Sequence, residues 1–296
     1  MNIGLMNLEP QIPNSAMMQV SQYHKNRGDQ VYDYNPLFDY DKTYVFSLFD
    51  FTDKSLVPPN AICGGTGFDI TSKLPREIEE SDLDYSIFLD CNYSMIWFSR
   101  GCFRNCPFCV VRQKEGNIHP VKPKNLNPNG EFIKVMDNNF FGNPKWKKSV
   151  QQLLKWNQPV DIQGFDIRIF DEEQGEALQR LKHRNNIKFA WDNPKDNLDD
   201  KIEELLNWVK PHKLRCYVLI GFWSTQEEDL HRVMHMWDEY KIPCFAMPYD
   251  KNDTYQRRFA RWCNNQKIFK KTSWGDYIGS YKREKGNIMY GQKRSV

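Results

Sequence analysis

Short apolar runs alternate with amphipathic stretches along most of the chain, which is the pattern of an α/β protein. In the first 80 residues, strands are predicted at 3–7, 30–34, 44–49 and 61–67. Between the first two strands, Asn14 or Ser15 is placed to cap a helix that ends near Gly28. This alternation predicts a small parallel, Rossmann-like sheet.

From Ser94 onward the alternation repeats six times, each predicted strand being followed by a predicted helix. The strands are predicted at 94–99, 132–137, 162–169, 187–191, 216–222 and 244–249. The helices are predicted at 107–115, 144–157, 174–184, 198–209, 226–240 and 255–266. Six such units predict an incomplete, open relative of the eight-stranded barrel, a partial (β/α)6 barrel.

A charged segment at 71–85, including Arg76-Glu77-Ile78-Glu79-Glu80, predicts the boundary between the two parts. The expected domains are therefore 1–80, 85–270 and a C-terminal tail at 271–296. The tail interleaves Lys and Arg with Trp274 and tyrosines such as Tyr290. Such residues could stack on bases and neutralise phosphates, or could form a flexible solvated tail.

The overall composition points to a soluble protein. Hydrophobic residues make up 40% of the chain, yet no apolar run approaches the roughly 20 residues that a membrane helix needs. The N-terminal residues lack the charged and apolar regions of a secretory signal, so we expect a cytoplasmic location. A net charge of +3 permits a nucleic-acid substrate without arguing for one.

The most specific motif is the loop Cys102-Phe103-Arg104-Asn105-Cys106-Pro107-Phe108-Cys109, in which three thiols follow the spacing C-x3-C-x2-C. Thiolates are the usual ligands of iron–sulfur clusters, and a cubane cluster has four irons. Three cysteines leave one iron without a protein ligand, where a substrate or cofactor can bind.

This loop resembles the signature of the radical S-adenosylmethionine (radical SAM) superfamily, whose core is usually a partial six-stranded barrel. The resemblance implies that Cys102, Cys106 and Cys109 hold a [4Fe–4S] cluster and that Phe108 lies against the adenine of SAM. In that family, the open iron chelates SAM, which is cleaved reductively to a 5′-deoxyadenosyl radical that abstracts hydrogen from the substrate. A structural zinc site, with Cys91 or His119 as a fourth ligand, is the alternative.

Residues at the ends of the later strands are candidates for SAM contacts, because chemistry collects at the C-terminal ends of parallel strands. Asp137-Asn138-Asn139 follow the second strand, where the family binds the SAM amino group, but they could instead cap the next turn. Strict alternation puts Asp166 and Arg168 on one face of the third strand. Arg168 is expected to meet the SAM carboxylate or a substrate anion, or else to pair with Asp166.

Two further candidates are associated with the fourth and fifth strands: Asp192 directly follows the fourth, and Gly221 lies near the end of the fifth. Asp192 could accept hydrogen bonds from ribose hydroxyls or could begin the turn Asp192-Asn193-Pro194. Gly221 would admit the close approach of a flat base, although an ordinary core strand explains its apolar neighbours equally well.

The order of domains is similar to that of radical SAM enzymes with an N-terminal cobalamin-binding domain. Their D-x-H-x-x-G motif is missing, and His24 lacks the aspartate, which argues against cobalamin. The turn Gly64-Gly65-Thr66-Gly67 matches neither the dinucleotide nor the Walker pattern. The remaining cysteines are expected to be small buried hydrophobes: Cys63, Cys91, Cys216, Cys244 and Cys263.

The sequence thus predicts a radical SAM enzyme whose reductant is a protein such as flavodoxin or ferredoxin. Its substrate is open, and a nucleotide or nucleic-acid base is one candidate. The alternative is a non-catalytic zinc or iron–sulfur protein that binds nucleic acid.

Overall fold

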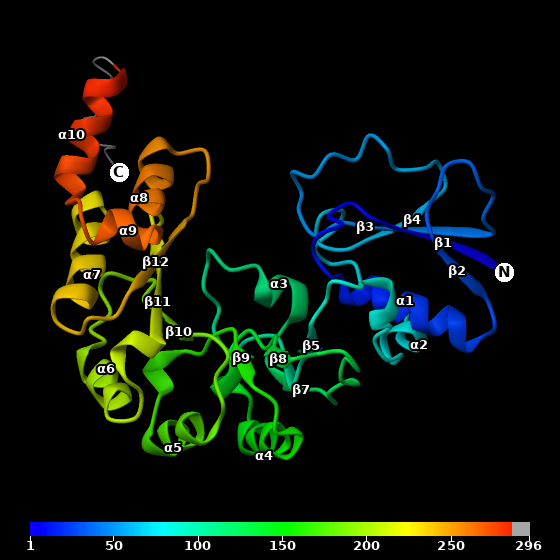
Figure 1. Cartoon of the computed structure of the whole chain (residues 1–296), viewed down its shortest axis with the longest axis horizontal. Helices are drawn as coiled ribbons and strands as arrows, with labels where there is room; N and C mark the ends of the chain where they lie inside the picture. The colour runs from blue at the N-terminus through cyan, green and yellow to red at the C-terminus, as the bar shows by residue number, and fades with distance from the viewer. Residues whose placement is uncertain (286–296) are drawn as a thin grey trace. The chain divides into compact units, whose positions relative to one another are not determined.

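The computed structural model describes residues 1–285 of the chain (Figure 1). These residues divide into two compact units. The first unit comprises Met1–Gln163 together with Arg180–Asn185, and the second comprises Gly164–Gln179 and the chain from Asn186 onward. The predicted boundary at 80–85 falls inside the first unit, where it separates two sheets, and the predicted domains stay a prediction.

The first unit begins with a four-stranded parallel sheet in the order β2-β1-β3-β4. Its strands are β1 (Asn2–Asn7), β2 (Gln30–Asp33), β3 (Lys42–Phe46) and β4 (Ile62–Gly64). The helix α1 (Ser15–Asn26) is capped by the Asn14 side chain, as the sequence predicts, and buries Met17 and Val20 against Ile3 and Phe46. A short helix, α2 (Arg76–Glu79), adds Ile78 to the same core.

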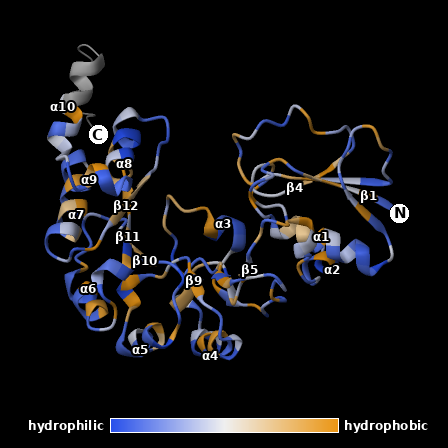
Figure 2. Ribbon diagram, viewed as in Figure 1, coloured by the Kyte–Doolittle hydropathy of each residue, from blue (hydrophilic) through white to orange (hydrophobic). Residues whose placement is uncertain are grey.

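The rest of the first unit holds a second parallel sheet in the order β5-β8-β9. Its strands are β5 (Tyr93–Ile96), β8 (Phe132–Val135) and β9 (Val160–Ile162). The helix α4 (Trp146–Trp156) connects β8 to β9 and buries Val150 and Leu153, while its lysines are exposed (Figure 2). A short antiparallel pair, β6 (Ser99–Arg100) and β7 (His119–Pro120), brackets the helix α3 (Val111–Glu115).

The second unit is built on the parallel sheet β10-β11-β12. Its strands are β10 (Ile187–Ala190), β11 (Leu214–Ile220) and β12 (Cys244–Pro248). Its helices are α5 (Glu172–Arg180), α6 (Asp199–Leu206), α7 (Gln226–Asp238), α8 (Thr254–Asn264), α9 (Gln266–Phe269) and α10 (Trp274–Lys285). The helix α7 begins with a capping box between Thr225 and Glu228, which satisfies two otherwise unpaired backbone donors.

The α/β class with parallel sheets is confirmed. All six strands predicted from residue 94 onward form in part, but as two three-stranded sheets. Within residues 1–285 they close no barrel, and an isolated parallel bridge joins Phe165 to Phe189. A single partial barrel therefore stays a prediction.

Two predicted elements are wrong in extent. The third strand was expected to run from Ile162 to Ile169, but β9 ends at Ile162 and Ile167–Ile169 forms a 3-10 turn. The side chain of Asp166 accepts from the N–H of Arg168, and an aspartate that caps a turn in this way competes with strand pairing. The first helix, expected from Pro107, begins only at Val111.

Part of the predicted tail is ordered as a helix. Trp274, the first residue of α10, lies against the rings of Phe259 and Trp262, with centroids 5.1 and 5.5 Å apart. The start of the tail is therefore anchored and not a solvated strand of chain. Other tail residues singled out in the sequence, including Tyr290, Lys293 and Arg294, lie outside the described residues.

Candidate functional site: the cysteine loop

The three cysteines of the motif lie in one loop between β6 and α3, in the first unit. Cys102, Cys106 and Cys109 are each partly exposed. The N–H of Cys109 donates to the carbonyl of Cys106 at 3.0 Å, which forms a tight turn around the C-x2-C pair. The N–H of Arg104 donates to the sulfur of Cys102 at 3.4 Å, so one thiol already receives a backbone hydrogen bond.

The base of this loop is closed by backbone contacts. The N–H of Cys102 donates to the carbonyl of Gly116 at 3.3 Å, and Arg112 donates to the carbonyl of Cys102 at 3.1 Å. Gly101 has a φ of 77°, and a Cβ there would lie 2.4 Å from the carbonyl oxygen of Asn117. Only glycine fits this position, because any side chain would collide with the returning strand.

Glu115 ties the loop to its surroundings through three hydrogen bonds. One carboxylate oxygen accepts from the N–H of Gly101 at 2.8 Å and from the side chain of Asn138 at 2.7 Å. The other oxygen pairs with Arg100 at 2.9 Å. The Glu115 side chain is only 12% exposed, and its charge strengthens the hydrogen bonds that it accepts.

The segment Asp137-Asn138-Asn139, predicted to bind the SAM amino group, lies beside the loop. The carboxylate of Asp137 is buried and accepts from the N–H of Phe98 and the hydroxyl of Ser99. Burial raises its pKa to about 6, although the hydrogen bond from Ser99 lowers it. Asn139 caps the short turn Phe140–Gly142, so all three residues have structural partners here and their role toward SAM stays a prediction.

Phe103 packs the loop against the same segment. A Cβ on Gly142 would lie 2.8 Å from the Phe103 ring, which shows how closely the ring covers this glycine. The cysteine loop and the 137–142 segment are therefore neighbours, as the sequence predicts for residues at the ends of adjacent parallel strands. Phe108 is partly exposed, and its expected contact with adenine stays a prediction.

The loop supplies the kind of donor atoms that an iron–sulfur cluster needs, but its three thiols do not point toward a common centre. Three thiols in eight residues, one of them accepting a backbone N–H, are the donors that such clusters use. Among residues 1–285, however, no three His, Cys, Asp or Glu side chains converge in a geometry that would hold a metal ion. Binding would require the three side chains to turn toward one point.

Arg168 lies in the second unit, and its position differs from the predicted one on a strand. Arg168 lies in a turn and not on a strand, and its guanidinium pairs with Asp166 at 2.7 Å and with Asp196 at 3.0 Å. The side chain of Arg168 is 39% exposed, which makes this the surface ion pair that the sequence left as an alternative. A role toward a ligand anion stays a prediction.

Asp192 has a carboxylate oxygen that is unsatisfied among residues 1–285, and its expected contact with ribose hydroxyls stays a prediction. One of its carboxylate oxygens is buried and accepts no hydrogen bond within the described chain. Burial raises the pKa of this carboxyl to about 6, against the lowering effects of Arg168 and Arg232. A buried, unsatisfied acceptor is costly, so a hydroxyl or amine of a ligand would complete this position.

Gly221 has a local structural reason to be glycine. Its φ is 77°, and a Cβ would lie 2.2 Å from the side-chain amide of Gln256. Gln256 is itself buried and accepts from the N–H of Asp250. The space above Gly221 is thus taken by Gln256, and the expected contact with a flat base stays a prediction.

His24 is buried and engaged on both ring nitrogens. One nitrogen lies 2.7 Å from Asp29 and the other lies 3.2 Å from the hydroxyl of Tyr44. Neither nitrogen is directed to an open surface. The expectation that cobalamin does not bind stays a prediction.

The structure gathers three cysteines that the sequence left scattered. Cys216 and Cys244 are paired residues on β11 and β12, and Cys263 of α8 lies near Cys244. Burial raises the pKa of Cys244 and of Cys263, which keeps these thiols protonated and unreactive. The expectation of burial is wrong only for Cys63, which is exposed.

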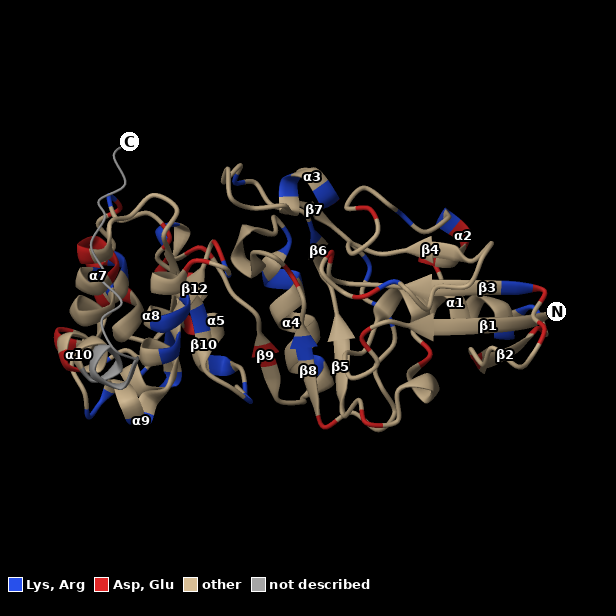
Figure 3. Cartoon of the chain, turned by 90° about the horizontal axis from the view of Figure 1, so that it is seen from above, with Lys and Arg blue, Asp and Glu red and all other residues tan. Residues whose placement is uncertain are grey.

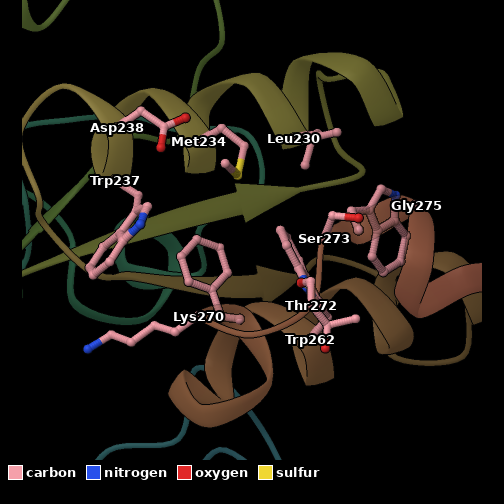
Figure 4. Close-up of a pocket in the computed structure, with 11 residues that line it drawn as sticks. Leu230, Met234, Trp237, Asp238, Trp262, Lys270, Thr272, Ser273 and Gly275 are labelled. Atoms are coloured by element: carbon pink, nitrogen blue, oxygen red, sulfur yellow. The ribbon is translucent and has the colours of Figure 1, made fainter.

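The second unit also contains a pocket of about 340 Å³ between α7 and the segment α8–α10 (Figure 4). Indole rings of Trp237, Trp262 and Trp274 form much of its wall, and Met234 points into it from α7. None of the residues singled out from the sequence as metal or SAM contacts lines this pocket. Its walls continue the aromatic core that anchors α10.

Among residues 1–285, no helix is both long and apolar enough to cross a membrane. Comparison with protein-family models gave no match, and comparison with curated proteins also gave none. The geometry of the cysteine loop therefore carries the functional argument by itself.

Proposed function

We propose that the chain is an enzyme of the radical SAM type, whose loop Cys102–Cys109 holds a [4Fe–4S] cluster with one iron open to S-adenosylmethionine. The observation that carries this proposal is the placement of three thiols in one loop that is closed at its base. When bound, such a cluster supplies the electron that cleaves SAM reductively.

The chain's own residues would hold and shape this site. The backbone N–H of Arg104, which donates to the sulfur of Cys102, would stabilise negative charge on that thiolate. Glu115 would fix the start of the loop through the N–H of Gly101 and would hold Asn138 through the same carboxylate oxygen.

The proposed partners follow from this chemistry. A cytoplasmic reductant protein such as flavodoxin or ferredoxin would supply electrons, and the substrate would be a hydrogen donor such as a nucleotide or a nucleic-acid base. The competing proposal is a non-catalytic zinc protein, which the tight turn around Cys106 and Cys109 favours, because a C-x2-C pair is a common half of a zinc site.

Metal content is the first test. Anaerobic reconstitution with iron and sulfide is expected to give a brown protein with ~4 irons per chain. The variant Cys106→Ser should lose the iron, whereas Cys63→Ser, which changes an exposed thiol outside the loop, should keep it. A colourless protein that binds zinc through the same three cysteines would contradict the proposal.

Cleavage of SAM is the second test. The reconstituted protein, reduced with dithionite, is expected to form 5′-deoxyadenosine from SAM, and Cys106→Ser should form none. If an intact, reduced cluster neither binds SAM, as followed by spectroscopy of the open iron, nor cleaves it, the enzyme proposal fails while the metal site stands.

A further inference from the structure

The glycine turn 64–67 lies where parallel sheets commonly bind ligands. All four strands of the N-terminal sheet are parallel, so the turn that follows β4 lies at their carboxyl edge. Gly65 has a φ of 98°, and a Cβ there would lie 2.4 Å from the carbonyl oxygen of Ser47. The turn is therefore held close against Ser47 in a shape that only glycine permits.

Two backbone donors of this turn have no partner in the described chain. The N–H of Gly67 donates to the carbonyl of Ser47 at 2.9 Å. Within residues 1–285, the N–H groups of Gly65 and Thr66 donate to no carbonyl and to no side chain. Successive N–H groups that are left open in a turn form a concavity that suits an anion.

Lys114 brings a positive charge to the same turn. Its ammonium donates to the hydroxyl of Thr66 at 2.6 Å, and no carboxylate of the described chain forms an ion pair with it. The neighbouring Glu115 is already engaged by Arg100, Gly101 and Asn138. Burial lowers the pKa of Lys114, because a partly desolvated ammonium is disfavoured, and the nearby charge of Glu115 only partly opposes this effect. The ribbon of α3 is coloured blue at its Lys and Arg positions in Figure 3.

We propose that the turn Gly64–Gly67 and Lys114 form a binding site for a phosphate group. The turn and Lys114 together offer four donors: the ammonium of Lys114, the hydroxyl of Thr66 and the N–H groups of Gly65 and Thr66. A phosphate has several terminal oxygens that can accept from donors in different directions, whereas a planar carboxylate has only two. This site uses no cysteine and does not depend on the proposed function.

The test measures the binding of inorganic phosphate to the full chain. Calorimetry gives the dissociation constant, and the melting temperature is compared at constant ionic strength with chloride as the reference anion. At about ten times its dissociation constant, phosphate is expected to raise the melting temperature of the wild-type chain by about 3 °C. Lys114→Met is expected to raise the dissociation constant for phosphate at least about tenfold, because the variant loses one hydrogen bond to a charged group.

The matched control is Lys124→Met. Lys124 is also partly buried, with a pKa lowered by burial, but it donates to the carbonyl of Glu79 and not to the turn. This variant should bind phosphate as the wild-type chain does. Thr66→Val removes one donor without touching a charge and should also weaken binding, so the test does not rest on one variant.

A second arm distinguishes the sources of phosphate. A nucleoside monophosphate that binds more than about tenfold tighter than inorganic phosphate, and loses binding in Lys114→Met, identifies a nucleotide site. Equal affinities identify a site for free phosphate. If wild-type, Lys114→Met and Lys124→Met respond to phosphate alike, the site does not exist, and the contact between Lys114 and Thr66 only attaches α3 to the turn.

Discussion

Glu115 connects the cysteine loop to its neighbours through a single carboxylate. Its carboxylate accepts from Gly101, which directly precedes Cys102, and from Asn138, which follows β8. A single side chain therefore fixes both the start of the loop and the neighbouring segment. Because these bonds involve a charged, largely buried acceptor, each is worth more than an ordinary surface contact.

We predict that Glu115→Gln will loosen the loop. The amide keeps the shape but loses the ion pair with Arg100, which should reduce the free energy of unfolding by about 1–3 kcal/mol. In the metal-free variant, the loop thiols should react faster with a thiol reagent than they do in the metal-free wild-type chain. The absorbance of the released product measures the rate, and mass spectrometry identifies the labelled cysteines.

The control for this change is Glu131→Gln. Glu131 accepts from Asn92 at 3.2 Å in an exposed position, so its loss should change the free energy of unfolding by less than about 0.5 kcal/mol. Equal labelling rates in wild-type and Glu115→Gln would mean that the backbone contacts close the loop without Glu115. Because this measurement needs no cluster, it is independent of the proposed function.

At the scale of secondary-structure elements, α10 is held by one aromatic side chain. Trp274 contacts the rings of Tyr255, Phe259 and Trp262, and the indole N–H of Trp262 donates to the carbonyl of Thr272 just before the helix. A helix of this length is marginal by itself, so tertiary packing supplies most of its stability.

We predict that Trp274→Ala will detach α10 from the second unit. Loss of a partly buried indole and of its ring contacts should reduce the free energy of unfolding by about 2–3 kcal/mol, measured in urea. Limited proteolysis should then cut the chain within residues 270–279. Trp223→Ala, at a site that is 44% exposed, should cost less than about 1 kcal/mol; equal losses in the two variants would contradict the anchoring role.

At the scale of the whole molecule, buried and exposed carboxyls have opposite effects on how the free energy of unfolding changes with pH. The pKa of Asp137 and that of Asp192 are raised to about 6 by burial, one in each unit. Hydrogen bonds lower the pKa of exposed groups such as Asp69. A raised folded-state pKa means that the folded chain binds more protons than the unfolded chain, so stability falls as the pH rises.

We predict that Asp137→Asn will remove part of this fall. Between pH 3.8 and about pH 6, the wild-type chain should lose up to ~3 kcal/mol of unfolding free energy relative to the variant, the linkage value of the raised pKa. Urea unfolding of both chains across this range measures the difference. Asp69→Asn should change the slope in the opposite direction, and a slope unaffected by Asp137→Asn would show that this carboxyl does not titrate as proposed.

Much of the fold follows from local sequence. The strands β1, β2, β8, β10, β11 and β12 and the helices α4, α7 and α8 lie close to their predicted bounds. Their apolar periodicity and capping residues, such as Asn14 and Thr225, act over only a few neighbouring positions. The third strand failed because Asp166 caps a turn within its predicted span, a local competition that periodicity alone does not reveal.

By itself, the sequence determined the α/β alternation, the parallel sheets and the presence of three thiols in one loop. Only the tertiary structure decided which residues meet: Glu115 with Gly101 and Asn138, Lys114 with Thr66, and Cys216 with Cys244. These partners lie 14 to 48 residues apart in the chain, or face each other across neighbouring strands. Periodicity and capping depend on adjacent residues, whereas such pairings depend on where the chain returns after a turn or a crossover.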